Sequence, residues 1–141
     1  MPSFYKFYPH NRIAVIGYLG EYTAEESLKT IGQYLQDPQY DPDFELVLDL
    51  TEAESTSATF FEMEKLVGEI ASKVQQSNRN ICVVIAVTDL LYGAARMYQQ
   101  LMQDKVSYPI EIVRNRIDAL ALLGLEGDSF ESLDHAPNAR S

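Results

Sequence analysis

Apolar residues recur along the chain in two patterns, short runs that are typical of β-strands and longer stretches with helical spacing. The joint Pro9-His10-Asn11 between the first two runs is short and polar, which predicts an antiparallel hairpin with its first strand at a sheet edge. A later run is apolar throughout and rich in β-branched residues, so we expect a central strand covered on both faces. The predicted strands are Phe4 to Tyr8, Arg12 to Tyr18, Phe44 to Leu50, Ile81 to Val87 and Tyr108 to Val113.

Four helices are predicted between and after these strands, each starting at a residue that can cap free backbone amides. Thr23 is followed three residues later by Glu26, a spacing typical of a capping box. Asp37-Pro38 ends the first helix and Gly124 ends the last. The predicted caps are Thr23, Thr59, Thr88 or Asp89, and Asn115. The apolar faces are Leu28, Ile31 and Leu35; Phe60, Met63, Val67, Ile70, Ala71 and Val74; Leu90, Ala94, Met97, Tyr98 and Leu101; and Ile117, Leu120, Ala121 and Leu123.

The predicted order β-β-α-β-α-β-α-β-α defines an α/β fold. Right-handed crossovers leave few ways to connect it, so we expect a mixed sheet of about five strands with about four helices packed against it. Residues 1–125 are expected to form one domain. The segment 126–141 is polar, and we expect a mobile tail in which Phe130 and Leu133 are the possible anchors.

Charge narrows the classes of partner. The chain has 21 acidic and 11 basic residues, a formal net charge of −10, which disfavours nucleic acid and anionic membranes as partners. No signal peptide or bilayer-spanning stretch is recognisable, so we expect a cytoplasmic protein. Cys82 is the only cysteine and lies in an apolar run, where we expect it to pack as a small hydrophobic residue.

Three local patterns carry a resemblance to a known family. They are VLDLTEAE at Val47 to Glu54, IAVTDLLYGAARMYQ at Ile85 to Gln99, and IEIVRNRIDALALLG at Ile110 to Gly124. Together with the element order, they make the chain similar to the STAS-like domains, also described as SpoIIAA-like or STAS/SEC14 domains, which are related to bacterial anti-sigma factor antagonists. The resemblance implies a bacterial regulatory module that docks a protein or a small ligand and is not an enzyme.

In the anti-sigma antagonists, a serine in an Asp-Ser-Ser/Thr-Gly motif at the start of the second helix is phosphorylated, and the phosphate disrupts docking. The corresponding stretch here is Thr56-Ser57-Ala58-Thr59-Phe60, without the aspartate and the glycine. Ser57 and Thr59 lie where a helix N-terminus would favour an added negative charge. The alternative is a capping role, since Glu62 follows Thr59 by three residues.

A candidate ligand site lies where the third helix begins. Parallel strands of open α/β sheets tend to bind ligands at their carboxyl ends. The candidate ligand-binding residues there are Asp49, Thr88, Asp89, Tyr92, Gly93 and Arg96. Gly93 would allow close approach of the backbone to a neighbouring strand or a ligand. In the structural alternative, Asp89 caps the helix, Gly93 packs, and Arg96 pairs with Asp49 or another acid.

Other candidate chemistry is sparse. His10 in the hairpin turn and His135 in the tail have no nucleophile near them in any obvious motif, so we predict neither catalysis nor a cofactor. Asp37, Asp41 and Asp43 fit no EF-hand spacing, and we interpret them as a solvated turn. Four tyrosines (Tyr5, Tyr8, Tyr18 and Tyr22) lie on or beside the first hairpin, and outward-facing ones would favour a homodimer.

The sequence therefore predicts a non-catalytic module that docks a protein partner. The first alternative is a small-ligand protein that binds a metabolite, anion or lipid near Asp89 to Arg96. The second is a phosphorylation-switched antagonist with a degenerate site at Ser57 or Thr59. A ligand-sized cavity between sheet and helices would favour the first alternative, whereas a solid interior with an exposed apolar patch would favour docking.

Overall fold

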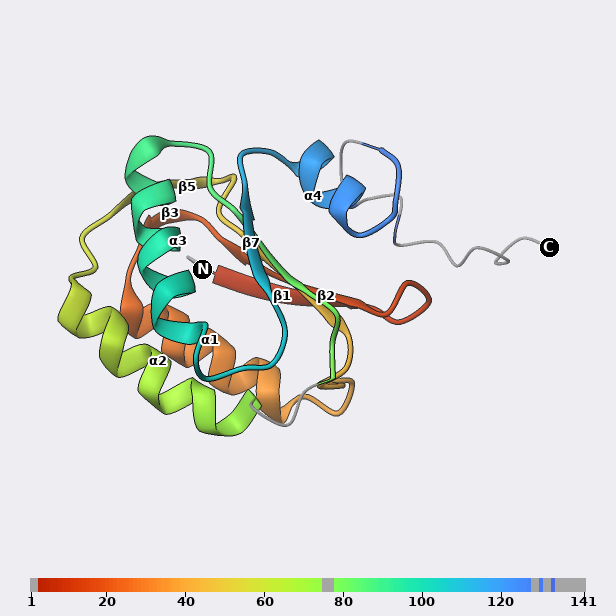
Figure 1. The fold of residues 1–141 in the computed structure, drawn as a ribbon, viewed down its shortest axis with the longest axis horizontal. Helices are drawn as coiled ribbons and strands as arrows, with labels where there is room; N and C mark the ends of the chain where they lie inside the picture. The colour runs from red at the N-terminus through yellow and green to blue at the C-terminus, as the bar shows by residue number, and fades with distance from the viewer. Residues whose placement is uncertain (1–2, 75–77, 128–129, 131–132, 134–141) are drawn as a thin grey trace.

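Five strands form a mixed sheet in the order β1-β2-β4-β6-β7 (Figure 1). The computed structural model describes residues 3–74, 78–127, 130 and 133. The predicted hairpin, the edge position of the first strand and the interior position of the apolar run that contains β6 are confirmed. β1 (Ser3–Tyr8) is antiparallel to β2 (Ile13–Tyr18), which continues in parallel through β4 (Glu45–Asp49), β6 (Cys82–Ile85) and β7 (Ile110–Val113).

Three helices cover one face of the sheet and one short helix lies on the other (Figure 1). The covering helices are α1 (Ala24–Gln36), α2 (Phe60–Val74) and α3 (Asp89–Met102), and α4 (Arg116–Leu122) packs on the opposite face. Because α1, α2 and α3 each connect parallel strands, all three begin near the carboxyl ends of the strands. The predicted α/β class, five-stranded mixed sheet and four helices are thus confirmed.

The helix starts follow the predicted caps. Thr23, Thr88 and Asn115 each accept a hydrogen bond from the backbone N–H three residues ahead, at 3.1, 3.2 and 2.8 Å. Thr88, and not Asp89, is therefore the cap of α3. Gly124 lies just past α4 with a φ of 77°, a left-handed conformation that ends a helix at little cost only for glycine.

Two short strands are absent from the predicted order. β3 (Gly20–Tyr22) and β5 (Ala53–Thr56) pair in parallel as a separate two-stranded sheet. Each follows the end of a longer strand, and Gly20, with a φ of 67°, redirects the chain after β2. With three and four residues, these strands are too short to show an alternating pattern in the sequence.

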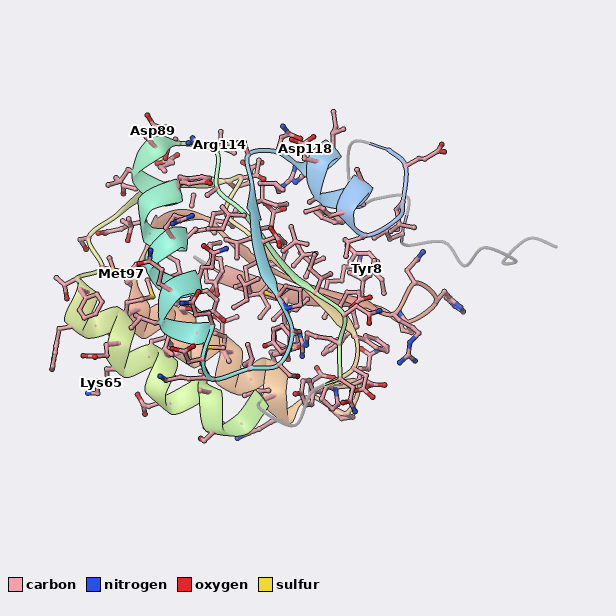
Figure 2. The ribbon with its side chains drawn as sticks, viewed as in Figure 1. Tyr8, Lys65, Asp89, Met97, Arg114 and Asp118 are labelled. Carbon is pink, nitrogen blue, oxygen red and sulfur yellow. The ribbon has the colours of Figure 1, made fainter. Side chains whose placement is uncertain are left out.

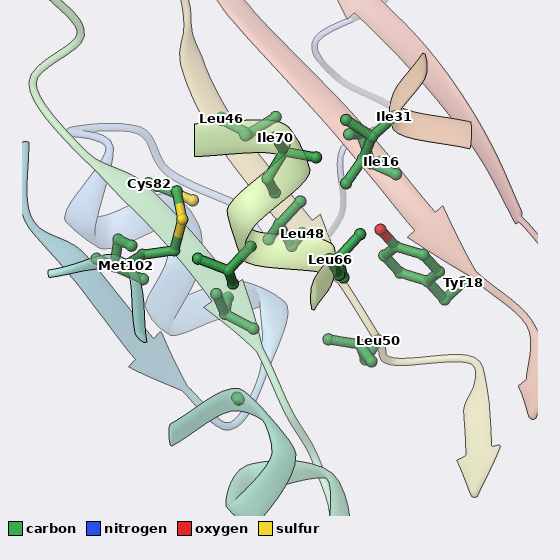
Figure 3. Close-up of a cluster of buried hydrophobic side chains, with 14 of the residues drawn as sticks. Ile16, Tyr18, Ile31, Leu46, Leu48, Leu50, Leu66, Ile70, Cys82 and Met102 are labelled. Atoms are coloured by element: carbon green, nitrogen blue, oxygen red, sulfur yellow. The ribbon is translucent and has the colours of Figure 1, made fainter. Parts of the chain in front are cut away.

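The larger core fills the space between the sheet and α1 to α3. Alternate residues of the strands point to this side, so the sheet contributes every second side chain. Figure 3 shows Ile16, Leu48 and Cys82 from three neighbouring strands packed against Leu66 and Ile70 of α2. Burial raises the pKa of the Cys82 thiol to about 12, which keeps the thiol protonated and unreactive at neutral pH.

The smaller core lies between the sheet and α4. Val47, Val83 and Ile85 point to this side. Phe130 and Leu133, the predicted anchors of the tail, are buried in the same cluster. Of the other residues of the predicted tail, 126 and 127 are described, and 128–129, 131–132 and 134–141, His135 included, lie outside the described residues.

Two expectations about exposure are wrong. Tyr8, Tyr18 and Tyr22 are buried, and Tyr5 packs against the larger core, so the hairpin has no outward tyrosine face to favour a homodimer. Three residues assigned to apolar helix faces are more than half exposed, and each lies in the first turn of its helix. We attribute this to the first turns, which project beyond the ends of the strands. The three residues are Phe60, Leu90 and Ile117.

Candidate functional site

The carboxyl edge of the parallel strands brings several of the predicted site residues together. Asp49 ends β4, and Thr88 and Asp89 follow β6 at the start of α3. Arg114 follows β7, and Figure 2 shows it beside Asp89. This end of the sheet is the predicted position for a ligand site.

Asp49 forms an ion pair with Arg116 on the α4 side of the sheet. Its side chain is 7% exposed, and its Oδ2 atom accepts a hydrogen bond from Arg116 Nε at 2.9 Å. Its Oδ1 atom accepts the backbone N–H of Thr51 at 2.9 Å. Asp49 is aligned with Ile85, which belongs to the smaller core, so its carboxylate points away from α3. The predicted pairing of Asp49 with Arg96 is therefore wrong, because α3 lies on the other face.

Asp89 forms an exposed ion pair with Arg114, at 3.0 Å. The side chain of Asp89 is 98% exposed and that of Arg114 is 46% exposed. Arg114 also donates to the carbonyl of Val87 at 3.3 Å, and its guanidinium lies 4.2 Å from the ring centre of Tyr92. These contacts connect the segment after β7 to the start of α3.

The remaining candidates do not converge on this pair. A Cβ atom added at Gly93 would meet nothing within 4 Å, so the predicted close approach of the backbone is wrong. Arg96 is exposed and forms no ion pair with any residue that the structure describes. The six predicted residues are thus divided between both faces of the sheet, with caps and ion pairs accounting for Thr88, Asp49 and Asp89.

The space behind α3 is small. A cavity of about 30 Å³ lies between the sheet and the helices, enough for a single water molecule. Tyr18 Oη and Ser27 Oγ are 2.9 Å apart at its wall, and burial raises the pKa of Tyr22 to about 12. A neighbouring hollow of about 20 Å³ shares Tyr98 in its lining and includes the buried Arg79, whose guanidinium lies 5.1 Å from the ring centre of Tyr108.

The start of α2 carries the predicted capping box. Thr59 donates its backbone N–H to Glu62 at 2.9 Å, and its hydroxyl accepts the N–H of Glu62 at 3.1 Å. Ser57 is exposed, and its hydroxyl donates to Glu21 at 2.8 Å. Both candidate phosphorylation residues are accessible, with Thr59 serving as the helix cap.

Two adjacent phenylalanines at the start of α2 are exposed, which the sequence does not predict. Phe60 is 56% exposed and Phe61 is 72% exposed. Its spacing predicts that Phe60 lies on the buried face of the helix. Consecutive helical residues point about 100° apart, so an aromatic pair in a first turn is a signal that one ring at least faces outward.

A groove of about 430 Å³ between α1 and α2 adjoins Phe61. Its apolar lining comes from Ala24, Leu28, Phe61 and Leu66, and its charged lining comes from Glu25, Glu62, Lys65 and Glu69. Figure 2 shows Lys65 on the outer side of α2. Phe61 belongs both to the exposed pair and to the lining of the groove, and we call Phe60, Phe61 and the groove together the α2 face.

The acidic loop before β4 has a structural role. Asp37 and Asp41 each accept the backbone N–H of the residue two positions ahead, at 2.8 and 2.9 Å, as in side-chain-stabilised turns. Asp43 accepts the backbone N–H of Asn78 at 2.9 Å and so connects this loop to the segment before β6. Over residues 3–74 and 78–127, no group of three or more His, Cys, Asp or Glu side chains is arranged to hold a metal ion. None of the helices described here is long and apolar enough to cross a bilayer.

Comparison with known proteins identifies no relative: no family model matches the chain, and neither curated proteins nor solved structures show significant similarity to it.

Proposed function

We propose that the protein is a non-catalytic, STAS-like docking domain that binds a protein partner through the α2 face. The observation that carries this proposal is the adjacent pair of exposed phenylalanines at the start of α2. Aromatic side chains are enriched in protein interfaces, and a contiguous apolar patch on a small domain is a frequent mark of a binding site. The groove beside Phe61 adds an indented surface that a partner segment can enter.

The size of the interior cavity supports docking over carriage of a small ligand. A carrier that uses the predicted site near Asp89 to Arg96 needs a pocket of about 300 Å³ or more there, whereas the space behind α3 is about 30 Å³. A metabolite panel tests this alternative through the melting temperature, because a ligand that binds the native state must raise it. We expect no compound to shift the melting temperature by more than about 1 °C. A reproducible shift that is lost on substitution of Tyr92 or Arg96 would favour the carrier.

A phosphorylation switch is a second possibility that one observation favours. The Ser57 hydroxyl already contacts the Glu21 carboxylate, and the segment leads directly into the phenylalanine pair. A phosphate on Ser57 would place like charges together and add a charge beside an apolar docking surface. Mass spectrometry of the protein from its native cells tests the switch, and absence of phosphate at Ser57 and Thr59 under all growth conditions would exclude it.

The docking proposal is tested by comparing three forms of the full chain as bait in native cells. The forms are the unchanged protein, the double variant Phe60→Ser/Phe61→Ser, and the control Ile117→Ser. Ile117 is 57% exposed in the first turn of α4, so the control removes a similar exposed apolar side chain on the opposite side of the sheet. Cross-linking followed by quantitative mass spectrometry measures the partner that each form retains.

We expect one partner that the unchanged protein and Ile117→Ser retain and that the phenylalanine variant loses by at least tenfold. All three forms should unfold at similar urea concentrations, since the replaced side chains are exposed. Equal retention by the three forms would contradict docking at the α2 face. Loss of the partner in the Ile117 control alone would move the interface to α4.

A further inference from the structure

The lining of the groove between α1 and α2 combines an apolar floor with an acidic rim. Leu28 of α1 is half-buried and Phe61 near the start of α2 is exposed, so these two side chains supply the accessible apolar surface, above the buried Leu66. Three carboxylates and one ammonium group complete the lining, so the groove carries a net negative charge. A segment that fills it must therefore match both an apolar strip and an acidic margin.

The acidic margin is largely uncompensated within the protein. Glu25 and Glu69 are exposed and form no ion pair with any of the residues described. Glu62 uses one carboxylate oxygen to cap α2 through Thr59. The carboxylates of the carboxyl edge, by contrast, are paired with Arg114 and Arg116. The charge on the groove is thus available to an incoming cation.

The geometry of the groove suits a helix. α1 and α2 both begin near the carboxyl edge of the sheet and pack side by side on the same face. Phe61, Lys65 and Glu69 are spaced four residues apart, which makes them one ridge along α2. Ridges of this spacing interlock with the side chains of a third helix, as in the helix-in-groove mode of peptide recognition.

We propose that the groove binds an amphipathic helix with a basic margin, presented by the protein partner. This inference rests on the proposed docking function and specifies the chemistry of the partner segment. Apolar residues of the helix at positions i, i+3 or i+4, and i+7 pack on Leu28 and Phe61. Lysine or arginine residues flanking that strip lie near Glu25 and Glu69, and one of them stacks over the exposed ring of Phe61.

The probes are three synthetic peptides of 18 residues with a fluorescent label. The first has leucine at helical spacing with lysine elsewhere, the second has the same leucine pattern with glutamate elsewhere, and the third has the composition of the first in an order without amphipathic spacing. Fluorescence anisotropy with the full chain measures their affinity. Amide chemical shifts in two-dimensional NMR locate the site where each peptide binds.

The matched variants change charge by the same amount at two places. Glu25→Lys/Glu69→Lys reverses the margin of the groove. Glu111→Lys/Glu126→Lys makes the same change in net charge at two exposed residues outside it, for which no ion pair occurs among the described residues. Thermal melting followed by circular dichroism checks that each variant is folded. If Glu25→Lys weakens the first turn of α1, the single variant Glu69→Lys replaces the double variant.

We expect the leucine-lysine peptide to shift the resonances of α1 and α2, with affinity that weakens at high salt because the exposed charges are screened. Reversal of the groove margin should weaken binding about tenfold, with the control pair changing it less than about threefold. The reversed groove should in turn bind the leucine-glutamate peptide better than the unchanged protein does.

Two outcomes would overturn the inference in different ways. Tighter binding of the leucine-glutamate peptide or the non-amphipathic peptide in the groove of the unchanged protein would contradict the basic helix and leave docking at the α2 face intact. Equal weakening by both charge variants, with shifts spread over the surface, would show that net charge alone attracts the peptide. Failure of the docking function itself appears separately, as retention of the cellular partner by Phe60→Ser/Phe61→Ser.

Discussion

The carboxyl edge and the α2 face use their polar and apolar groups in opposite ways. At the carboxyl edge, Asp49 and Asp89 are held by arginines that follow β7, and the nearby interior has room for one water molecule. On the α2 face, two phenylalanines are exposed and the groove between α1 and α2 has carboxylates without ion-pair partners among the described residues. The charged groups of the carboxyl edge bind partners within the protein, whereas the apolar and acidic groups of the α2 face are exposed to an external partner.

Charged residues at the ligand-prone edge of a sheet can therefore be structural and need not form a ligand site. Arg116 begins α4, so its bond to Asp49 fixes the short helix against the sheet end. A site for a new ligand would have to replace these contacts. The α2 face requires no such replacement, because its groups are already exposed to solvent. Three structural features distinguish the two regions: the closed interior behind α3, the ion pair between Asp49 and Arg116, and the capped start of α2.

The largest expected effect tests whether the interior behind α3 is closed. Burial raises the pKa values of Tyr22 and Tyr34 to about 12, above the value of about 10 in the unfolded chain. The folded state therefore holds these protons more tightly, and its stability is retained below pH 10 and lost as the pH rises towards 12. We expect the free energy of unfolding to fall by about 3 kcal/mol between pH 9 and 11 from these two tyrosines, with a further fall from Tyr18 and Tyr108, whose pKa values burial also raises.

Urea denaturation at each pH measures this loss. Salt at about 0.5 M reduces the contribution of surface charge. The variant Cys82→Ala removes the separate contribution of the buried thiol, whose pKa is also raised. Stability that stays constant to pH 11 would mean that solvent reaches the interior, and would reopen the small-ligand alternative.

The second effect tests the structural role of the buried ion pair. Arg116→Ala leaves the Asp49 carboxylate buried without its guanidinium partner, and we expect the free energy of unfolding to fall by about 2 kcal/mol. Urea denaturation at pH 7 measures the change. The matched control is Arg114→Ala, which removes the arginine of the exposed ion pair with Asp89. An unchanged stability in Arg116→Ala would indicate that Asp49 is free to serve another role.

The third effect tests the rigidity of the α2 start. Thr59→Ala removes the hydroxyl that accepts the N–H of Glu62, and loss of such a cap costs about 1 kcal/mol. Ser57→Ala removes only an exposed hydrogen bond to Glu21, so it should change stability by less than about 0.5 kcal/mol. Thermal melting followed by circular dichroism compares the two. Equal effects would mean that the capping box does not hold the docking surface in place.

The smallest expected effect concerns the exposed ion pair. Arg114→Ala should lower the free energy of unfolding by no more than about 0.5 to 1 kcal/mol, because Asp89 remains fully solvated when its partner is lost. Denaturation at low and high salt checks that the remaining effect is screened. A loss as large as that of Arg116→Ala would remove the distinction between the two pairs and would assign the stacking of Arg114 on Tyr92 a larger role.

The parts of the fold that depend on local patterns are predictable from the sequence. Alternating or continuous apolar runs marked the five strands of the main sheet, and caps such as Thr23 and Asn115 marked the helix starts. The capping box at Thr59 is also predictable from the sequence, since it depends on two residues only three positions apart. Spacing of this kind is a property of the backbone geometry and needs no distant partner.

Which side chains meet and which stay exposed, by contrast, depends on how the elements pack in three dimensions. Sheet register turned Asp49 towards α4 and Arg116, away from the helix that carries Arg96. The exposure of Phe60 followed from the position of its helical turn, although its spacing matched the buried face. Pairing and exposure depend on segments that are distant in the sequence, so the periodicity of a single helix or strand cannot predict them.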